Sequence, residues 1–122
     1  MFGIGCDIEK VGRFREALGD SAFLRRVFTP KELRYCMRQG SRTKAIARIF
    51  ACKEAVFKAL SSLGYKTLLS SIEIPDEKGH GKYFVVKRSG KGDVSYKVFV
   101  SSSCAGDLIY ASSVAEIARG RG

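Results

Sequence analysis

The stretch MFGIGCDIE (residues 1–9) opens the chain, and its alternating residue types predict a β-strand. With a period of two, the strand has one apolar face and one nearly bare face: Phe2, Ile4, Cys6 and Ile8 on the first, and Gly3, Gly5 and Asp7 on the second. We expect the apolar face to be buried in the core. Because the glycines leave the other face bare up to Asp7, we expect a second protein segment or a ligand to approach the backbone there.

Helical patterns follow this strand through the first half of the chain. Apolar spacing predicts an amphipathic helix over 11–18 that Gly19 ends, and a shorter helix over 21–27. The stretch FTPKEL (28–33) predicts the start of another helix, because it supplies an N-cap, a first-position proline and a capping-box glutamate: Thr29, Pro30 and Glu32. We expect Gly40 to end that helix.

A long helix is predicted over 43–62, and six residues have the spacing of its buried face: Ile46, Ile49, Phe50, Val56, Phe57 and Leu60. On another face Glu54 and Lys58 lie one turn apart. The small residues Ala47 and Ala51 precede them on that face. The helix is therefore expected to present an acid and a base beside a cleared surface.

Strand patterns fill the second half of the chain, with turn-rich segments between them. The predicted strands are 68–74, 82–88, 94–100 and 108–117. Short connections favour antiparallel hairpins. The fold class is therefore α+β, with the N-terminal strand and the helices packed on an antiparallel sheet. We predict a single domain over 1–117 and a frayed tail over 118–122.

Composition narrows the class of protein. Nearly half of the 122 residues are apolar, no run is long enough to span a membrane, and we see no export signal at the N-terminus. Four scattered cysteines without a CxxC pair, and one histidine, indicate free thiols in a reducing cytoplasm and no zinc site. The net charge of +10 attracts polyanions, namely nucleic acid, phosphorylated small molecules or an acidic protein.

Asp7 and Glu54 are candidate ligands for a metal ion. If the long helix packs over the first strand, the two carboxylates form a site for a hard cation such as Mg²⁺, and Lys58 can meet a phosphate. Taken separately, Glu54 and Lys58 are an ordinary surface pair, and Asp7 is a cap for the next helix. Both interpretations stay open at this point.

Four blocks of the sequence resemble a known family. GIGCDIEKVGRF (3–14), FTPKEL (28–33), ARIFACKEAVFKAL (47–60) and SSSCAGDLIYASSVA (101–115) resemble, in order, the motifs of holo-acyl-carrier-protein synthases, the small bacterial 4′-phosphopantetheinyl transferases. The resemblance implies that the 4′-phosphopantetheine arm of coenzyme A is transferred to a serine of apo acyl carrier protein, releasing adenosine 3′,5′-bisphosphate. It also implies the phosphopantetheinyl transferase fold.

The resemblance implies roles for individual residues. Asp7 and Glu54 match the magnesium-binding carboxylates, and Lys58 matches the lysine beside the pyrophosphate, so these three form the catalytic set. Arg13 matches a residue that docks the acidic carrier protein. The family is typically a homotrimer with active sites at subunit interfaces, and the glycine face of the first strand is then a candidate subunit contact. The identity of the general base, Glu54 or a water, stays open.

The chain departs from the family around the coenzyme A contacts. Ile49 replaces an arginine, and Arg48, one position earlier, is rotated by about 100° on the helix. Ser61 begins a Ser-Ser-Leu stretch where the family has Gly-Thr-Gly, and Cys104 replaces a histidine. We retain Arg48, Ser61 and Cys104 as cofactor-contacting candidates with altered contacts. His80, in a turn of the sheet, is expected to be exposed.

Two other functions compete with the transferase. The net charge and the thirteen tyrosines and phenylalanines also suit a module that binds nucleic acid, although most of these aromatic residues fall at core positions. The chain could also be a catalytically silent relative that binds carrier protein without modifying it. Salt-sensitive RNA binding that survives Asp7→Ala would favour the first, and docking without transfer would favour the second.

Overall fold

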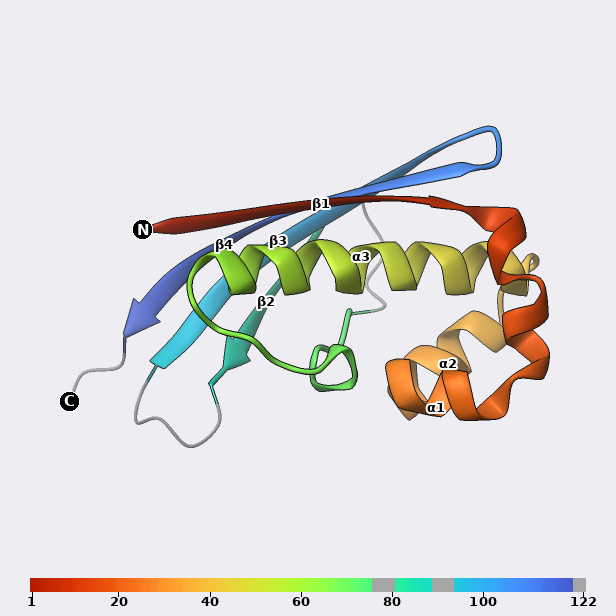
Figure 1. Cartoon of the computed structure of the whole chain (residues 1–122), viewed down its shortest axis with the longest axis horizontal. Helices are drawn as coiled ribbons and strands as arrows, with labels where there is room; N and C mark the ends of the chain where they lie inside the picture. Colours follow the sequence, from red (N-terminus) through yellow and green to blue (C-terminus); the bar gives the residue numbers. More distant parts are fainter. Residues whose placement is uncertain (76–80, 89–93, 120–122) are drawn as a thin grey trace.

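A single long helix lies along one face of a four-stranded antiparallel sheet, and the short helices gather at one end (Figure 1). The computed structural model describes residues 1–75, 81–88 and 94–119. Its elements, in order, are β1 (Phe2–Lys10), the 3₁₀ helices η1 (Val11–Phe14) and η2 (Glu16–Gly19), α1 (Ser21–Val27), α2 (Pro30–Met37), α3 (Arg42–Ser62), η3 (Leu69–Ser71), β2 (Lys82–Lys87), β3 (Val94–Ala105) and β4 (Leu108–Arg119). The sheet order is β1-β4-β3-β2. The predicted α+β class is confirmed.

The glycine face of β1 is the one that packs on α3. A Cβ atom on Gly3 would lie 2.1 Å from the carbonyl oxygen of Ala59, and one on Gly5 would lie 2.0 Å from that of Ala55. A second segment therefore does approach the bare face, as predicted, and it is the chain's own helix, not a neighbouring subunit. The prediction that the apolar face is buried was wrong. Its large residues are exposed because the bare face is the only one that lets a helix backbone come so close: Phe2, Ile4 and Ile8.

The helical half follows the sequence signals closely, with one exception. Thr29 and Glu32 form the predicted capping box, and α2 ends at Met37, three residues before Gly40. Instead of one helix over 11–18, the structure has η1 and η2. The backbone N–H of Val11, which has no acceptor within a helix that begins there, donates to the carbonyl of Asp107 in the β3–β4 turn at 2.8 Å and so joins the start of η1 to the sheet.

Three of the four predicted strands are confirmed, and 68–74 is not a strand. Its backbone is held by side chains: Glu32 accepts from the N–H of Ile74 at 2.8 Å, and the ammonium of Lys53 donates to the carbonyl of Ile72. These polar groups need no strand partner. At the other end of the chain β4 continues to Arg119, two residues beyond the predicted end of the domain at 117 and so into the predicted tail.

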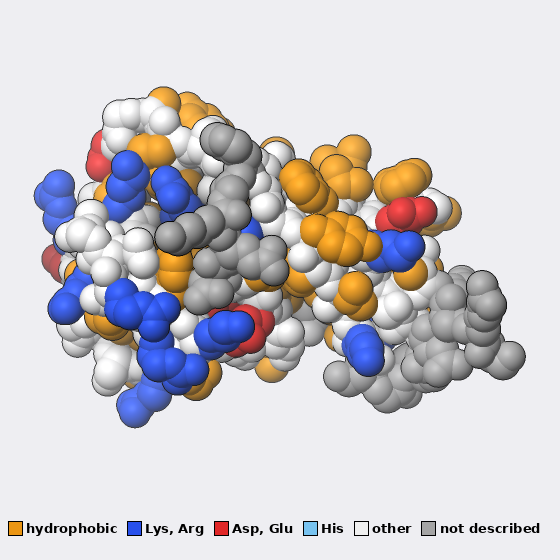
Figure 2. All heavy atoms as spheres, turned by 180° about the vertical axis from the view of Figure 1, so that it is seen from behind, with side chains coloured by type: hydrophobic (Ala, Val, Ile, Leu, Met, Phe, Trp, Pro, Cys, Tyr) orange, Lys and Arg blue, Asp and Glu red, His pale blue; other side chains and the backbone are white. Residues whose placement is uncertain are grey.

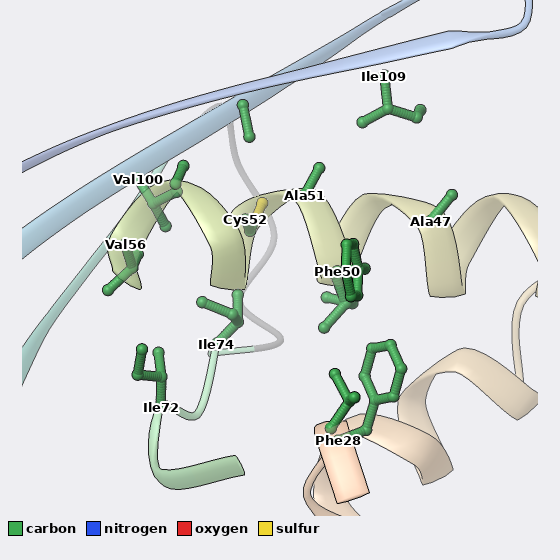
Figure 3. Close-up of a cluster of buried hydrophobic side chains, with 14 of the residues drawn as sticks. Phe28, Ala47, Phe50, Ala51, Cys52, Val56, Ile72, Ile74, Val100 and Ile109 are labelled. Carbon is green, nitrogen blue, oxygen red and sulfur yellow. The ribbon is translucent and has the colours of Figure 1, made fainter. Parts of the chain in front are cut away.

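The core lies between α3, the sheet and the short helices. In Figure 3, Ala47 and Ala51 point toward the sheet, where Ile109 lies, while Phe50 points toward Phe28. Both alanines are fully buried, so the cleared surface expected beside Glu54 is an interface with the sheet. Five of the six residues predicted for the buried face of α3 are buried, and Phe57 is half-buried. In the described part of the chain no helix is long and apolar enough to cross a membrane.

Candidate active site

Asp7 lies where the glycine face of β1 ends, and it points to α3. Its side chain is 10% exposed, and Oδ1 accepts a hydrogen bond from Nζ of Lys58 at 3.1 Å. Lys58 also donates to the carbonyl of Cys6 at 3.0 Å, while half of its side chain stays in contact with solvent. Asp7 does not cap the next helix, because Lys10 is the N-cap residue of η1. The structure thus brings the predicted strand carboxylate to the predicted lysine.

Glu54 completes the predicted set from the preceding turn of α3. Burial raises the pKa of its carboxyl group, and the negative charge of Asp7 raises that pKa further. The positive charges of Lys58 and Arg13 act in the opposite direction. Two carboxylates and two cations are therefore close enough to influence one another at the contact between β1 and α3.

Glu9 is a buried carboxylate near Asp7 that sequence reasoning missed. It is 7% exposed, and burial, followed by the neighbouring carboxylate of Asp7, raises the pKa of its carboxyl group to about 7. Arg13 donates a hydrogen bond to its Oε1 atom. A signal was present in the sequence, because the alternation that groups Gly5 with Asp7 also places Glu9 on the same face.

Arg13 connects the carboxylates to a cavity on the short helices. Its guanidinium carbon lies 5.5 Å from the ring centroid of Phe14 and 5.9 Å from that of Phe50. The cavity has a volume of about 210 Å³ and is lined by residues of η1, η2 and α1 with their connections: Arg13, Phe14, Glu16, Ala17, Asp20 and Phe23. It presents both apolar and polar atoms beside the arginine.

The structure places the three predicted cofactor-contacting residues at different distances from this cluster. Arg48, on α3, lines a second cavity of about 150 Å³ with Lys44 and Ser41, and its Nε atom is buried without a hydrogen-bond partner among the described residues. It precedes Glu54 by six residues, or about 9 Å along the helix axis. Ser61 is half-buried in the last turn of α3.

Cys104 and His80 were also singled out in the sequence. Cys104 pairs with Ile109, which pairs with Glu9 on β1, so Cys104 lies two strands, or about 10 Å, from Glu9 on the same face of the sheet. His80 lies outside the described residues. All four cysteines are free, as predicted.

The donor set fits a divalent cation that binds oxygen. Oδ2 of Asp7 is buried without a hydrogen-bond partner in the described part of the chain, and burial, followed by the negative charge of Asp7, raises the pKa of Glu54. No three metal-ligating side chains converge among the described residues. Two carboxylates, with substrate phosphates and waters at the other positions, are the usual protein contribution to Mg²⁺ sites.

The chain is similar to known proteins along most of its length. Residues 3–111 match the 4′-phosphopantetheinyl transferase superfamily. The chain belongs to this family. A holo-[acyl-carrier-protein] synthase of Clostridium kluyveri is 33% identical over 125 residues, with 96% of this chain and 91% of the relative covered. A synthase with the same name from Fusobacterium nucleatum is 34% identical over 86 residues, which are 70% of each chain.

Solved structures of the phosphopantetheinyl transferases agree in fold along almost the whole chain. An ACPS–CoA complex from Chronobacterium ammoniagenes superimposes with a TM-score of 0.74 at 26% identity, covering 98% of this chain and 99% of that one. The synthase of Thermotoga maritima has a TM-score of 0.69 at 27% identity and covers 95% of this chain and 64% of its own. The resemblance seen in the sequence motifs is confirmed, and with it the class of enzyme.

Proposed function

We propose that this transferase moves the 4′-phosphopantetheine arm of coenzyme A to a serine of apo acyl carrier protein and releases adenosine 3′,5′-bisphosphate, with Mg²⁺ as the metal. The observation that carries the proposal is the meeting of Asp7, Glu54 and Lys58 at the contact between β1 and α3, in a chain of this family. Asp7 and Glu54 would hold the ion. Bound Mg²⁺ neutralises charge that develops on pyrophosphate oxygens.

The chain's own groups supply the remaining functions. Half of the Lys58 side chain is exposed, and its ammonium group is held in place by Asp7. The ammonium group is therefore already oriented to bind a phosphate oxygen. The serine proton would pass to Glu54 or to a water beside it. Arg48, in the second cavity, and Cys104, on β3, would contact the nucleotide, and Ser61 would lie one turn beyond Lys58.

The acceptor would dock on the basic end of the molecule. Figure 2 shows Lys and Arg side chains gathered at the end that carries α1 and α2, where four of them are exposed: Arg25, Arg26, Lys31 and Arg34. Carrier proteins are acidic, and complementary charge speeds and orients docking. Arg13, beside the cavity, lies between this basic end and the carboxylates. Arg13→Glu should therefore raise the KM for carrier protein far more than the KM for coenzyme A.

We propose a homotrimer, with the outer face of the sheet as the subunit contact. Large apolar side chains are exposed on this face: Phe2, Ile4, Ile8, Tyr83, Val85, Phe99, Tyr110 and Val114. Figure 2 shows hydrophobic side chains gathered at the end opposite α1 and α2, where the strands lie. Large apolar side chains gathered on one exposed face mark an interaction site. The four free thiols support a reducing compartment such as the cytoplasm.

The direct test mixes the purified chain with coenzyme A, Mg²⁺ and apo carrier protein and weighs the carrier by mass spectrometry. We expect a gain of one arm that a chelator prevents, and its loss in Asp7→Asn and Glu54→Gln. Glu73→Gln, which changes an exposed glutamate elsewhere, is the matched control. Near-wild-type turnover in either site variant contradicts the metal assignment. Carrier binding without transfer by the wild-type chain indicates the silent relative.

A further inference from the structure

Glu9 is an unusual residue for the end of an edge strand, because its charged group is buried. It pairs with Ile109 across the β1–β4 ladder, so its backbone is fixed, and only 7% of the residue is exposed. A carboxylate is rarely buried to this extent unless it is paired with a cation or hydrogen-bonded. The groups that surround the Glu9 carboxylate therefore indicate its role.

The cationic partner of Glu9 is Arg13, which follows it by four residues and lies in η1. Nη1 of Arg13 donates to Oε1 of Glu9, and the guanidinium lies over the rings of Phe14 and Phe50. Although 65% of the Arg13 side chain is exposed, its charged end is thus held from two directions. A guanidinium has five N–H donors, so most of them remain available after the bond to Glu9.

The second partner of Glu9 is the active site itself. Glu9 follows Asp7 by two residues on the same face of β1, so the two carboxylates lie side by side. Burial, followed by the negative charge of Asp7, raises the pKa of Glu9, and the positive charge of Arg13 lowers the pKa of both Glu9 and Glu54. Arg13 is therefore close enough to the carboxylates to act on them electrostatically, and it also lines the cavity of about 210 Å³ on the short helices. Glu9 is thus the residue that binds Arg13 and lies next to Asp7 on the same face of β1.

We propose that Glu9 is a positioning residue for the acceptor. It holds the Arg13 guanidinium at the boundary between the cavity on the short helices and the active-site carboxylates. An acidic group of the carrier protein that binds Arg13 is thereby brought next to Asp7 and Glu54. The inference rests on the proposed function. An arginine that is already held in place loses less side-chain freedom when the carrier binds, and this difference is worth about threefold to tenfold in affinity.

The test is a double-mutant cycle on carrier binding, measured by isothermal titration calorimetry with a carrier protein whose acceptor serine is alanine. Glu9→Ala should weaken binding about threefold to tenfold while the KM for coenzyme A changes less than about twofold. In the Arg13→Ala background the same substitution should have no further effect. Glu73→Ala, at an exposed glutamate elsewhere, is the matched control and should bind like the wild type.

Glu9→Gln provides the second variant. Its side-chain oxygen still accepts from Arg13 without the charge, so we expect an intermediate loss of affinity that also disappears in the Arg13→Ala background. If Glu9→Ala does not fold, as judged by circular dichroism, the cycle is completed with Glu9→Gln. Unchanged carrier affinity in a folded Glu9 variant, the same loss with and without Arg13, or an equal loss for coenzyme A overturns the proposal.

Failure of this inference is distinguishable from failure of the proposed function. A wild-type chain that modifies the carrier but shows no coupling between Glu9 and Arg13 overturns the role of Glu9 alone. A wild-type chain that neither binds nor modifies the carrier overturns the proposed function, and the role of Glu9 with it.

Discussion

Replacement of Gly5 by alanine should separate β1 from α3 and reduce both stability and activity. The added Cβ would lie 2.0 Å from the carbonyl oxygen of Ala55 and 2.6 Å from the backbone nitrogen of Ala59. Real Cβ contacts are essentially never shorter than 3.0 Å, so strand and helix must move apart by at least about 1 Å. Both contacts are with backbone atoms, and no side chain can rotate away.

The magnitude follows from this displacement. Overpacking costs about 1–3 kcal/mol, and contacts between backbones belong at the upper end of that range. For a chain of this length, about 3 kcal/mol lowers the Tm by roughly 10 °C. The hydrogen bond between Lys58 and Asp7, now 3.1 Å long, would be stretched out of range. A misplacement of about 1 Å in an active site lowers the rate about a hundredfold.

Thermal melting and the initial rate of arm transfer measure these two effects. Gly19→Ala is the matched control, because a Cβ at that position meets nothing within 4 Å, and it should leave both quantities unchanged. If Gly5→Ala melts like the wild type and transfers the arm at the wild-type rate, β1 and α3 do not pack through the glycine face, and the active site derived from that contact is wrong.

Three further predictions concern other parts of the molecule. Lys53→Met should destabilise the chain by about 3 kcal/mol or more in urea unfolding, because it leaves the buried carboxylate of Glu32 unpaired; a change below about 1 kcal/mol contradicts this. The pKa of Glu9 is raised from 4.5 to about 7, so the stability that its protonated carboxyl group contributes at low pH is lost as the pH rises from about 4.5 to about 7. The Tm of Glu9→Gln relative to wild type should therefore rise across this range and stay level above it, and a difference that does not change with pH contradicts this. Ile4→Glu, on the exposed face of β1, should convert the proposed trimer to monomers in light scattering without loss of circular dichroism, and an unchanged mass removes this face from the interface.

Much of the fold could be predicted because local signals and tertiary packing agree. The FTPKEL stretch contains its own N-cap, proline and capping-box glutamate, and the structure makes both capping-box hydrogen bonds at 3.2 Å and 2.8 Å. The long helix was predicted to begin within one residue of its observed start. In each case the interactions that decide the structure connect residues a few positions apart.

The segment 68–74 was misassigned because its partners are far away in the sequence. Its apolar residues suit a strand, but the backbone of Ile72 and Ile74 is bound by Lys53 and Glu32. Glu32 is thereby used twice, since the same carboxylate also accepts from the backbone of Thr29. Local patterns cannot show that a capping residue is also a long-range partner.

The face of β1 and the role of Glu9 share one physical origin. Burial was assigned to the larger side chains, but a helix backbone can come closest to a strand that has no side chains. Once the glycine face is the inner face, every second residue after Gly5 lies on that face too, so the carboxylates of Asp7 and Glu9 are on the inside. Lys58 is the cation that pairs with Asp7, and Arg13 is the cation that pairs with Glu9. The apolar residues of the same strand are then outside, where they need a partner. A single reversal of face thus accounts for the buried Glu9, for the arginine held beside the proposed active site and for the surface proposed to join the subunits.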